Sequence, residues 1–150
     1  MAISLPSDFK EFLKLLNAKR VKYLVIGGYA VGYHGYPRAT NDLDVFVAAE
    51  HKNAENLVTV LREFGFGTSD LSPDLFLQDK IVRMGVAPIR IELTTHISGV
   101  SFDECFKERV VAVIDGIRVN LIGLAKLKRN KKASGRHKDL DDLEHLPRVR

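Results

Sequence analysis

Two carboxylates placed just before an apolar run could hold a divalent metal ion. The stretch GGYAVGYHGYPRATNDLDVFV, residues 27–47, contains Asp42 and Asp44 one residue apart. On a β-strand such residues point to the same face, where two carboxylates repel each other unless a cation lies between them. Mg²⁺ prefers a few carboxylates together with water and substrate phosphates. The pattern therefore predicts a magnesium site; the alternative is the surface start of a strand, where solvated aspartates cap a turn.

A third acidic residue lies in a second apolar segment. Glu92 is flanked by apolar side chains in IRIELTT, where a charged residue is unexpected. If this strand neighbours the strand of Asp42 and Asp44, Glu92 completes a cluster of three carboxylates. The alternative is an outward-facing glutamate on a half-exposed strand, paired with Arg90.

A glycine pair precedes the acidic strand. Gly27 and Gly28 follow the apolar run YLVI and come before a short helical pattern. Glycine lets a phosphate approach the backbone, and a helix N-terminus favours anions. The spacing matches neither the dinucleotide-binding G-x-G-x-x-G pattern nor a P-loop, so neither of those folds is predicted.

The elements that must position these residues can be assigned from periodicity and turn signals. We expect a helix capped by Ser7 and running to about Lys19, a strand over 23–28, a helix over 29–35, a strand over 42–48, a helix over 50–66, strands around a turn near Ala87-Pro88, a hairpin over 110–122 turning at Asp115-Gly116, and helices over about 123–133 and 137–146. The order predicts an α+β fold, with a small mixed β-sheet flanked by helices.

Composition indicates one soluble globular domain over residues 1–150. Hydrophobic residues make up 45% of the chain and charged residues 28%. No apolar run approaches the roughly 20 residues that a membrane helix needs. The N-terminus lacks the pattern of a secretory signal, and the single cysteine, Cys105, allows no internal disulfide. We therefore expect a cytoplasmic protein that does not enter a membrane.

The positive charge is concentrated near the C-terminus. Residues 1–120 carry a net charge of −1, whereas residues 121–150 carry +5. The segment 126–138 has seven basic residues and no acidic one. Such a block favours polyanions, namely the phosphates of a nucleotide, RNA, or both. The alternative is a solvated face of the basic C-terminal helical segment, residues 123–146.

Taken together, these motifs resemble the nucleotidyltransferase superfamily, which has the polymerase-beta-like fold. Its signature is a strand, a glycine pair, a short helix, Asp-x-Asp on the next strand and a later third acidic residue. Residues 27–47, including Pro37-Arg38-x-Thr40, are similar to the N-terminal motif of small bacterial proteins related to the AbiEii and MenT toxins. NKKASGRHKDLDDLEHL, residues 130–146, resembles their C-terminal motif. The third acidic position is commonly Asp in these families, whereas this chain has Glu92.

The resemblance implies transfer of a nucleoside monophosphate from an NTP to a hydroxyl, with Mg²⁺ or Mn²⁺ as cofactor. It implies that Asp42, Asp44 and Glu92 hold the metal, and that Glu92 also helps to activate the acceptor hydroxyl, directly or through a second metal ion. The implied catalytic residues are Asp42, Asp44, Glu92 and Lys131, and the implied nucleotide-binding residues are Gly27, Gly28, Arg38, Thr40, Lys131, Arg136 and Asp139. Asp139 would orient Lys131 or Arg136; the alternative is that it caps the last helix.

The acceptor and the partner proteins stay open at this stage. The basic segment favours RNA, especially tRNA, and hence a toxin with an antitoxin partner; a protein acceptor is the other option. A non-catalytic module that keeps the fold and binds a nucleotide or a partner is the main alternative. A basic RNA-binding domain is a third reading, but it leaves the carboxylates unexplained.

Overall fold

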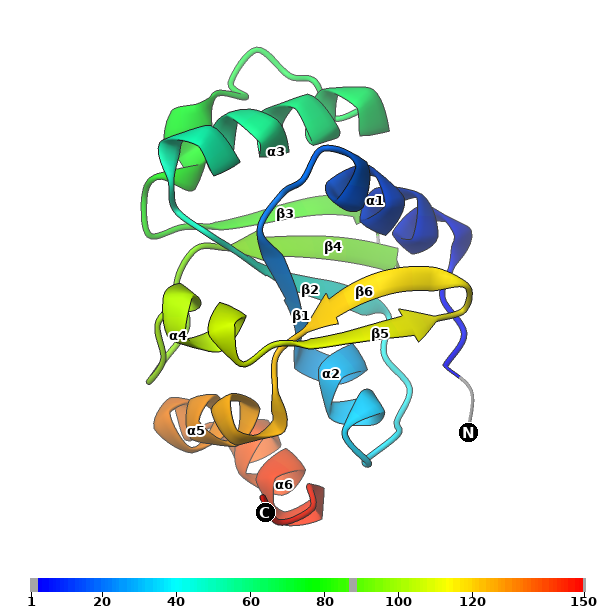
Figure 1. Ribbon diagram of the computed structural model, residues 1–150, viewed down its shortest axis with the longest axis vertical. Helices are drawn as coiled ribbons and strands as arrows, with labels where there is room; N and C mark the ends of the chain where they lie inside the picture. Colours follow the sequence, from blue (N-terminus) through cyan, green and yellow to red (C-terminus); the bar gives the residue numbers. More distant parts are fainter. Residues whose placement is uncertain (1–2, 87–88, 150) are drawn as a thin grey trace.

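The chain forms a six-stranded mixed β-sheet with helices on both sides, in a computed structural model that describes residues 3–86 and 89–149 (Figure 1). The strands are Tyr23–Ile26 (β1), Asp42–Val47 (β2), Ile81–Val86 (β3), Ile89–Thr94 (β4), Val110–Ile114 (β5) and Ile117–Leu121 (β6). The helices are Ser7–Ala18 (α1), Gly27–Tyr33 (α2), His51–Phe64 (α3), Phe102–Lys107 (α4), Leu124–Ser134 (α5) and His137–His145 (α6), with a 3₁₀ turn at Pro73–Phe76 (η1). The predicted α+β fold class is confirmed.

Strand β2 lies in the middle of the sheet, whose order is β3-β4-β2-β1-β6-β5. It runs antiparallel to β1 and parallel to β4. The strand of Glu92 is therefore the direct neighbour of the strand of Asp42 and Asp44, as the sequence analysis required for a carboxylate cluster. In Figure 1, α1 and α3 lie above the sheet, whereas α2, α5 and α6 lie below it.

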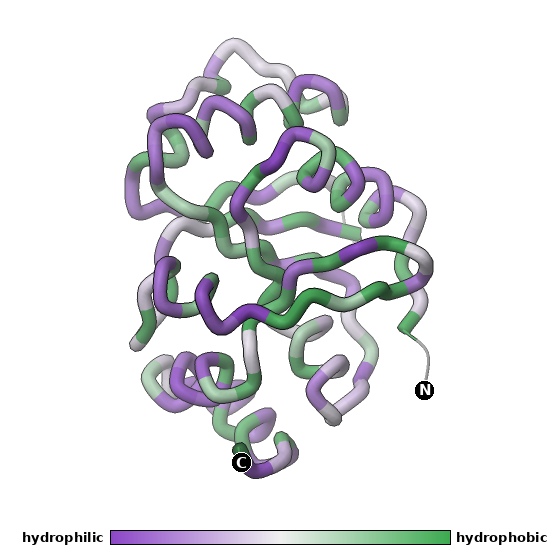
Figure 2. The backbone as a smooth tube through the Cα atoms, viewed as in Figure 1, coloured by the Kyte–Doolittle hydropathy of each residue, from purple (hydrophilic) through white to green (hydrophobic). Residues whose placement is uncertain are grey.

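The core forms where the apolar faces meet. The predicted inward side chains of α1 and β2 are all buried, and they are Phe9, Phe12, Leu13, Leu16, Leu43, Val45 and Val47. Figure 2 shows the same pattern, with apolar segments along the strands and polar segments along the outer sides of the helices. Because Leu43 and Val45 face the core, the alternate residues of β2 face the other side of the sheet.

Three predicted boundaries are corrected. Helix α1 starts at Ser7 but the capping position is Pro6, and no side chain caps the helix; Ser7 already lies inside the first turn. Strand β1 ends at Ile26 because Gly27 has a φ of +67°, outside the β region. Helix α2 accordingly starts at Gly27, two residues earlier than predicted. The predicted turn near Ala87-Pro88 lies outside the described residues, and the sequence analysis missed α4 and η1.

The C-terminal third follows the turn signals closely. Asp115 and Gly116 both have positive φ, as the tight primed turn of the β5–β6 hairpin requires. Gly135 adopts a left-handed conformation and separates α5 from α6. None of the helices within the described residues is long and apolar enough to cross a membrane.

Candidate active site

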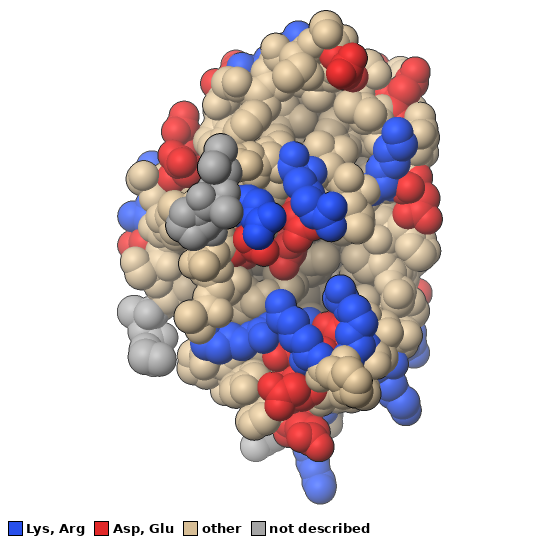
Figure 3. Space-filling model, turned by 180° about the vertical axis from the view of Figure 1, so that it is seen from behind, with Lys and Arg blue, Asp and Glu red and all other residues tan. Residues whose placement is uncertain are grey.

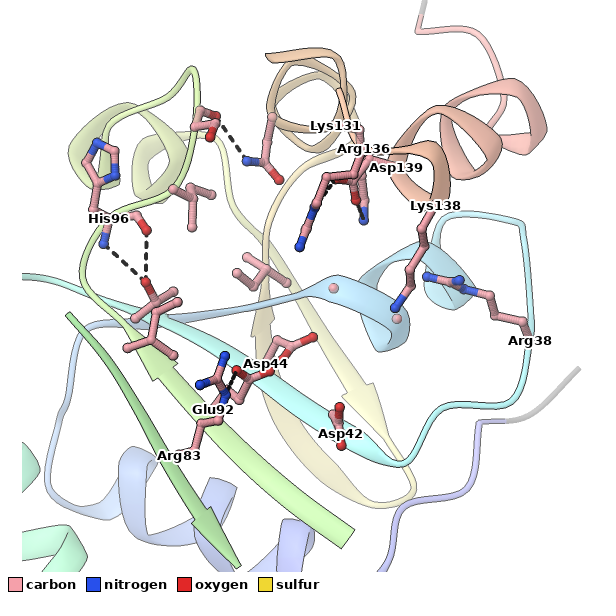
Figure 4. Close-up of a pocket in the computed structure, with 18 residues that line it drawn as sticks. Arg38, Asp42, Asp44, Arg83, Glu92, His96, Lys131, Arg136, Lys138 and Asp139 are labelled. Atoms are coloured by element: carbon pink, nitrogen blue, oxygen red, sulfur yellow. Dashed lines mark hydrogen bonds and ion pairs between the residues drawn. The ribbon is translucent and has the colours of Figure 1, made fainter. Parts of the chain in front are cut away.

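Parallel pairing of β2 with β4 brings the acidic residues together. Asp44 is opposite Glu92, and Asp42 is opposite Arg90. The side chains of Asp42, Asp44 and Glu92 all line one cleft of about 400 Å³. Figure 4 shows the three side chains rising from the two strands toward α5 and α6.

The glycine pair allows the start of α2 to contact this strand. A Cβ on Gly27 would collide with the carboxylate of Asp44, and its φ of +67° also favours glycine. A Cβ on Gly28 would lie 2.7 Å from Oγ1 of Thr40. Glycine at both positions is therefore needed for β2 and its preceding loop to lie against the helix start.

Two of the carboxylates have arginine partners. Nε of Arg83 on β3 donates to Oε1 of Glu92 at 2.8 Å (Figure 4). Nε of Arg90 lies 3.7 Å from Oδ1 of Asp42. The proposed alternative pairing of Glu92 with Arg90 is therefore not the observed one, because the antiparallel register of β3 and β4 places Arg83 opposite Glu92.

Asp44 lies between the other two and is the most perturbed group. Burial, a hydrogen bond with Glu92 and the charges of Glu92 and Asp42 raise the pKa of Asp44 to about 7, against the lowering effect of the charge of Lys138. Excess negative charge at this point is the environment that a bound cation relieves.

This pKa gives a testable pH dependence of stability. The pKa of Asp44 is 3.8 in the reference state and about 7 in the fold. Between these values the folded state retains a proton that the unfolded state has lost, so the free energy of unfolding falls as pH rises through this window. Asp44→Asn removes this loss of stability, because asparagine does not ionise. Its melting temperature in metal-free buffer should exceed that of the wild type at about pH 8 but not at about pH 4, by roughly 2–4 °C per kcal/mol regained.

Differential scanning calorimetry in the presence of EDTA measures this effect. Asp70→Asn serves as the matched control, because Asp70 is exposed and lies in a turn away from the cleft. The control should show no pH-dependent difference from the wild type. An Asp44→Asn difference that is equal at both pH values would contradict the prediction.

A buried ion network forms the opposite wall of the cleft. Nζ of Lys131 lies 2.9 Å from Oδ1 of Asp139 and 3.1 Å from Oδ2 of Asp142. Nη2 of Arg38, from the loop before β2, donates to the same Oδ2 at 2.9 Å. The side chains of Lys131, Asp139 and Asp142 are almost inaccessible to solvent. The network therefore joins α5 and α6 to the loop before β2.

Asp139 orients basic residues, which is one of its two predicted roles. It accepts hydrogen bonds from Lys131, Ser134 and Arg136, the last at 2.7 Å. Although burial raises its pKa, these bonds and the charge of Lys131 lower it to about 2. The other role, capping α6, is not observed: the capping position is Arg136, which has no side-chain capping bond.

The cleft collects nearly all of the predicted site residues. They are Gly27, Gly28, Arg38, Asp42, Asp44, Glu92, Lys131, Arg136 and Asp139. Thr40 lies instead on an adjoining cavity, which Gly28 and Arg38 also line. Figure 3 shows the result on the surface, where basic side chains lie on both sides of an acidic patch across a hollow.

Sequence reasoning missed two basic residues of the cleft. Arg83 lines it from β3, and its role follows only from the register of β3 on β4. Lys138 lines it from the first turn of α6, is exposed, and forms no salt bridge with another described residue (Figure 4). Its signals in the sequence were its place in the basic segment and in the C-terminal motif, residues 130–146. By contrast, Lys131 already has two carboxylate partners.

The carboxylates fit a magnesium ion by their chemistry. Mg²⁺ needs one or two protein carboxylates, with the remaining ligands from water and phosphates. The adjacent Asp44 and Glu92, with Asp42 beside them, meet that need. Within residues 3–86 and 89–149, however, no group of three or more His, Cys, Asp or Glu side chains is placed so that it could hold a metal ion by itself.

Solved structures share this fold at low sequence identity. A candidate nucleotidyltransferase from Thermotoga maritima is 15% identical with a TM-score of 0.61, covering 91% of this chain and 88% of its own. A lincosamide antibiotic adenylyltransferase, LnuA, bound to lincomycin, is 13% identical with a TM-score of 0.56, covering 95% and 96%. An antigenic nucleotidyltransferase-like protein from Paracoccidioides brasiliensis is 20% identical with a TM-score of 0.53, covering 94% and 76%.

Sequence comparison gives the family. No curated protein matches the chain. The model of the family described as "Nucleotidyl transferase of unknown function (DUF2204)" matches residues 6–150, nearly the whole chain. The acidic strand β2, the glycine pair and the basic wall of the cleft, formed by Lys131, Arg136 and Lys138, all lie inside the matched region. The chain belongs to this nucleotidyl transferase family.

Proposed function

We propose that the protein transfers a nucleoside monophosphate from an NTP to a hydroxyl acceptor with the help of Mg²⁺ or Mn²⁺. The observation that supports this most strongly is the meeting of Asp44 and Glu92 on adjacent strands, opposite a basic wall from α5 and α6. A triphosphate with its metal needs both kinds of group within one cleft.

The carboxylates have distinct roles in this proposal. Asp42 and Asp44, with Glu92, would hold the metal, and the ion would supply positive charge that neutralises the triphosphate and would stabilise the attacking and leaving oxygens. Glu92 would take the proton of the acceptor hydroxyl. The acceptor oxygen then bonds to the α-phosphorus, the bond from that phosphorus to the bridging oxygen breaks, and pyrophosphate leaves.

The basic wall would receive the pyrophosphate. Arg136 and Lys138 are exposed and line the cleft, so they can contact phosphate oxygens. Lys131 was predicted to do so directly; because it is buried between Asp139 and Asp142, we propose that it acts mainly by holding Asp139 and hence Arg136 in place. Arg38 and Thr40 would donate to the nucleotide beside Gly28.

The acceptor we favour is RNA, in particular tRNA. Exposed cations of α5 and α6 continue the basic wall beyond the cleft. A polyanion is attracted to such a surface. A role as a cytoplasmic toxin controlled by an antitoxin follows from the motifs in the sequence and stays a prediction.

Label transfer tests the proposal. The purified protein is incubated with each of four α-labelled NTPs, with total tRNA or with protein alone, in Mg²⁺ or in excess EDTA. We expect label on tRNA in Mg²⁺ with one preferred NTP, and none in EDTA. Label that appears only on the protein would show that the acceptor is a protein and not RNA. Transfer that is unaffected by EDTA would contradict the metal role.

The ion pair of Arg83 with Glu92 favours one alternative, a non-catalytic module that binds a nucleotide. In that case the arginine permanently occupies the carboxylate that should accept the proton. Arg83→Ala separates the two functions. An enzyme should transfer label in the wild type, in Arg83→Ala, or in both. A binding module should transfer no label in either form, although both forms still bind NTP.

A further inference from the structure

We propose that the cavity adjoining the cleft binds the nucleoside part of a substrate. Its volume is about 430 Å³, close to that of the cleft. Gly28 and Arg38 line both, so one ligand can extend from the first into the second. The inference rests on the proposed function, since it assumes that phosphates lie in the cleft, and it adds the place of the uncharged part of the substrate.

The two cavities differ in the chemistry of their walls. Charged side chains of both signs line the cleft. Among the described residues, the only charged side chain on the wall of the second cavity is Arg38, and no carboxylate lies there. Ile3, Pro37 and Ala39 give apolar surface, and Ser4 and Thr40 give hydroxyls. A mostly apolar wall with a few polar groups suits an uncharged ring with hydrogen-bonding edges.

Gly32 keeps the wall open although the fold does not require glycine there. It lies in α2 without a positive φ, and a Cβ would meet only Cα of Pro37, at an ordinary 3.8 Å. Glycine weakens a helix relative to alanine, so a packing or conformational reason is normally expected. Gly28 and Gly32, four residues apart, lie on one helix face; Thr40 already packs against Gly28, so the part of this face that is open to a ligand lies at Gly32.

Arg38 has unused hydrogen-bonding capacity where the two cavities meet. Its Nη2 is held by Asp142 at 2.9 Å. Its Nε is buried and has no hydrogen-bond partner among the described residues. Because the Arg38 side chain is still 23% exposed, a ribose hydroxyl or a phosphate oxygen at this junction could accept from its guanidinium group. Figure 4 shows Arg38 reaching toward the cleft from the loop before β2.

The nucleoside has two possible sources with the same chemistry. It can be the nucleoside of the donor NTP or the 3′-terminal nucleoside of an RNA acceptor. In both cases a phosphate lies in the cleft and a base lies against α2. Binding measurements separate them.

Gly32→Leu is the test, because it fills the cavity from α2 without touching the carboxylates. Isothermal titration calorimetry in Mg²⁺ measures the affinity for each NTP, for inorganic tripolyphosphate and for a short single-stranded RNA with a free 3′-hydroxyl. We expect a loss of about tenfold or more for NTP or for RNA, with tripolyphosphate unchanged. Loss for NTP assigns the donor nucleoside to the cavity, and loss for RNA assigns the acceptor.

Two further variants complete the design. Gly67→Leu is the control, because Gly67 lines neither cavity and its Cβ would only contact Arg62 at 3.5 Å or more. Ala39→Leu fills the cavity from its other wall and replaces Gly32→Leu if circular dichroism shows that the latter does not fold. Wild-type affinity for every NTP and for RNA in a folded filling variant would overturn the proposal, as would a wild type that binds tripolyphosphate as tightly as every NTP and does not bind RNA.

Label transfer measured in parallel distinguishes failure of the nucleoside cavity from failure of the proposed enzyme activity. Nucleoside binding that depends on Gly32, in a wild type that transfers nothing, would support the cavity and refute the enzyme. Transfer by the wild type with unchanged binding in the filling variants would support the enzyme and refute the cavity.

Discussion

Asp44→Asn should reduce nucleotide transfer by about 10²–10³-fold or more, the loss seen when one electrostatic stabiliser is removed from an active site. Asparagine keeps the size of the side chain and removes its charge. Asp44 lies against Gly27 and opposite Glu92, so no other described carboxylate can take its place without moving β2. Initial rates over a range of Mg²⁺ concentrations measure the effect. If Asp44 binds the metal as proposed, higher Mg²⁺ should recover little of the rate, because it restores occupancy of the site but not the position that Asp44 would give the ion.

Two observations make this result interpretable. Asp44→Asn should be at least as stable as the wild type near neutral pH, so a loss of activity cannot be attributed to unfolding. Asp70→Asn should transfer at the wild-type rate. A folded Asp44→Asn protein with wild-type transfer would show that the acidic strand is not the metal site.

Lys131→Met should lower the free energy of unfolding by about 3–5 kcal/mol, as expected when one member of a buried ion network is removed. Asp139 and Asp142 would keep their charges in an almost fully buried place, with Arg38 and Arg136 as their remaining cations. In a domain of this size the melting temperature should fall by roughly 6–20 °C. Thermal and urea unfolding, followed by circular dichroism, measure both quantities.

Lys138→Met is the matched control. The same substitution at an exposed lysine should change stability by no more than about 0.5 kcal/mol. It should nevertheless slow transfer, because Lys138 is the exposed ammonium of α6 that lines the cleft. Equal stability of Lys131→Met and the wild type would refute the structural role of Lys131. Unchanged transfer by Lys138→Met would show that Lys138 does not take part in the transfer.

The sequence predicted those features whose signals are local. Alternation in β2 placed Asp42 and Asp44 on one face and Val45 on the other, because the side-chain period of a strand is two residues. Asp115-Gly116 predicted its hairpin because few residue pairs tolerate two positive φ values. The α+β class followed from the order of such elements.

The partners of the site residues could not be predicted, because they depend on register and packing. Arg83 meets Glu92 only through the pairing of β3 with β4. Lys131 was predicted as a cation that contacts the nucleotide, with Asp139 orienting it or Arg136; nothing local indicates that Asp142 also lies against it in a buried place. From the sequence, Lys138 was only one more basic residue of the segment 126–138 and of the C-terminal motif. Its position on the cleft follows from the packing of α6.

The salt bridge between Arg38 and Asp142 joins residues that are 104 positions apart in the chain. A ribosome adding about 5–20 residues per second needs roughly 5–20 s to make that stretch. For most of this interval the nascent chain has its acidic strand β2 but not yet α5 and α6, which carry the basic side chains of the cleft. The cleft therefore cannot be complete until synthesis has passed α6.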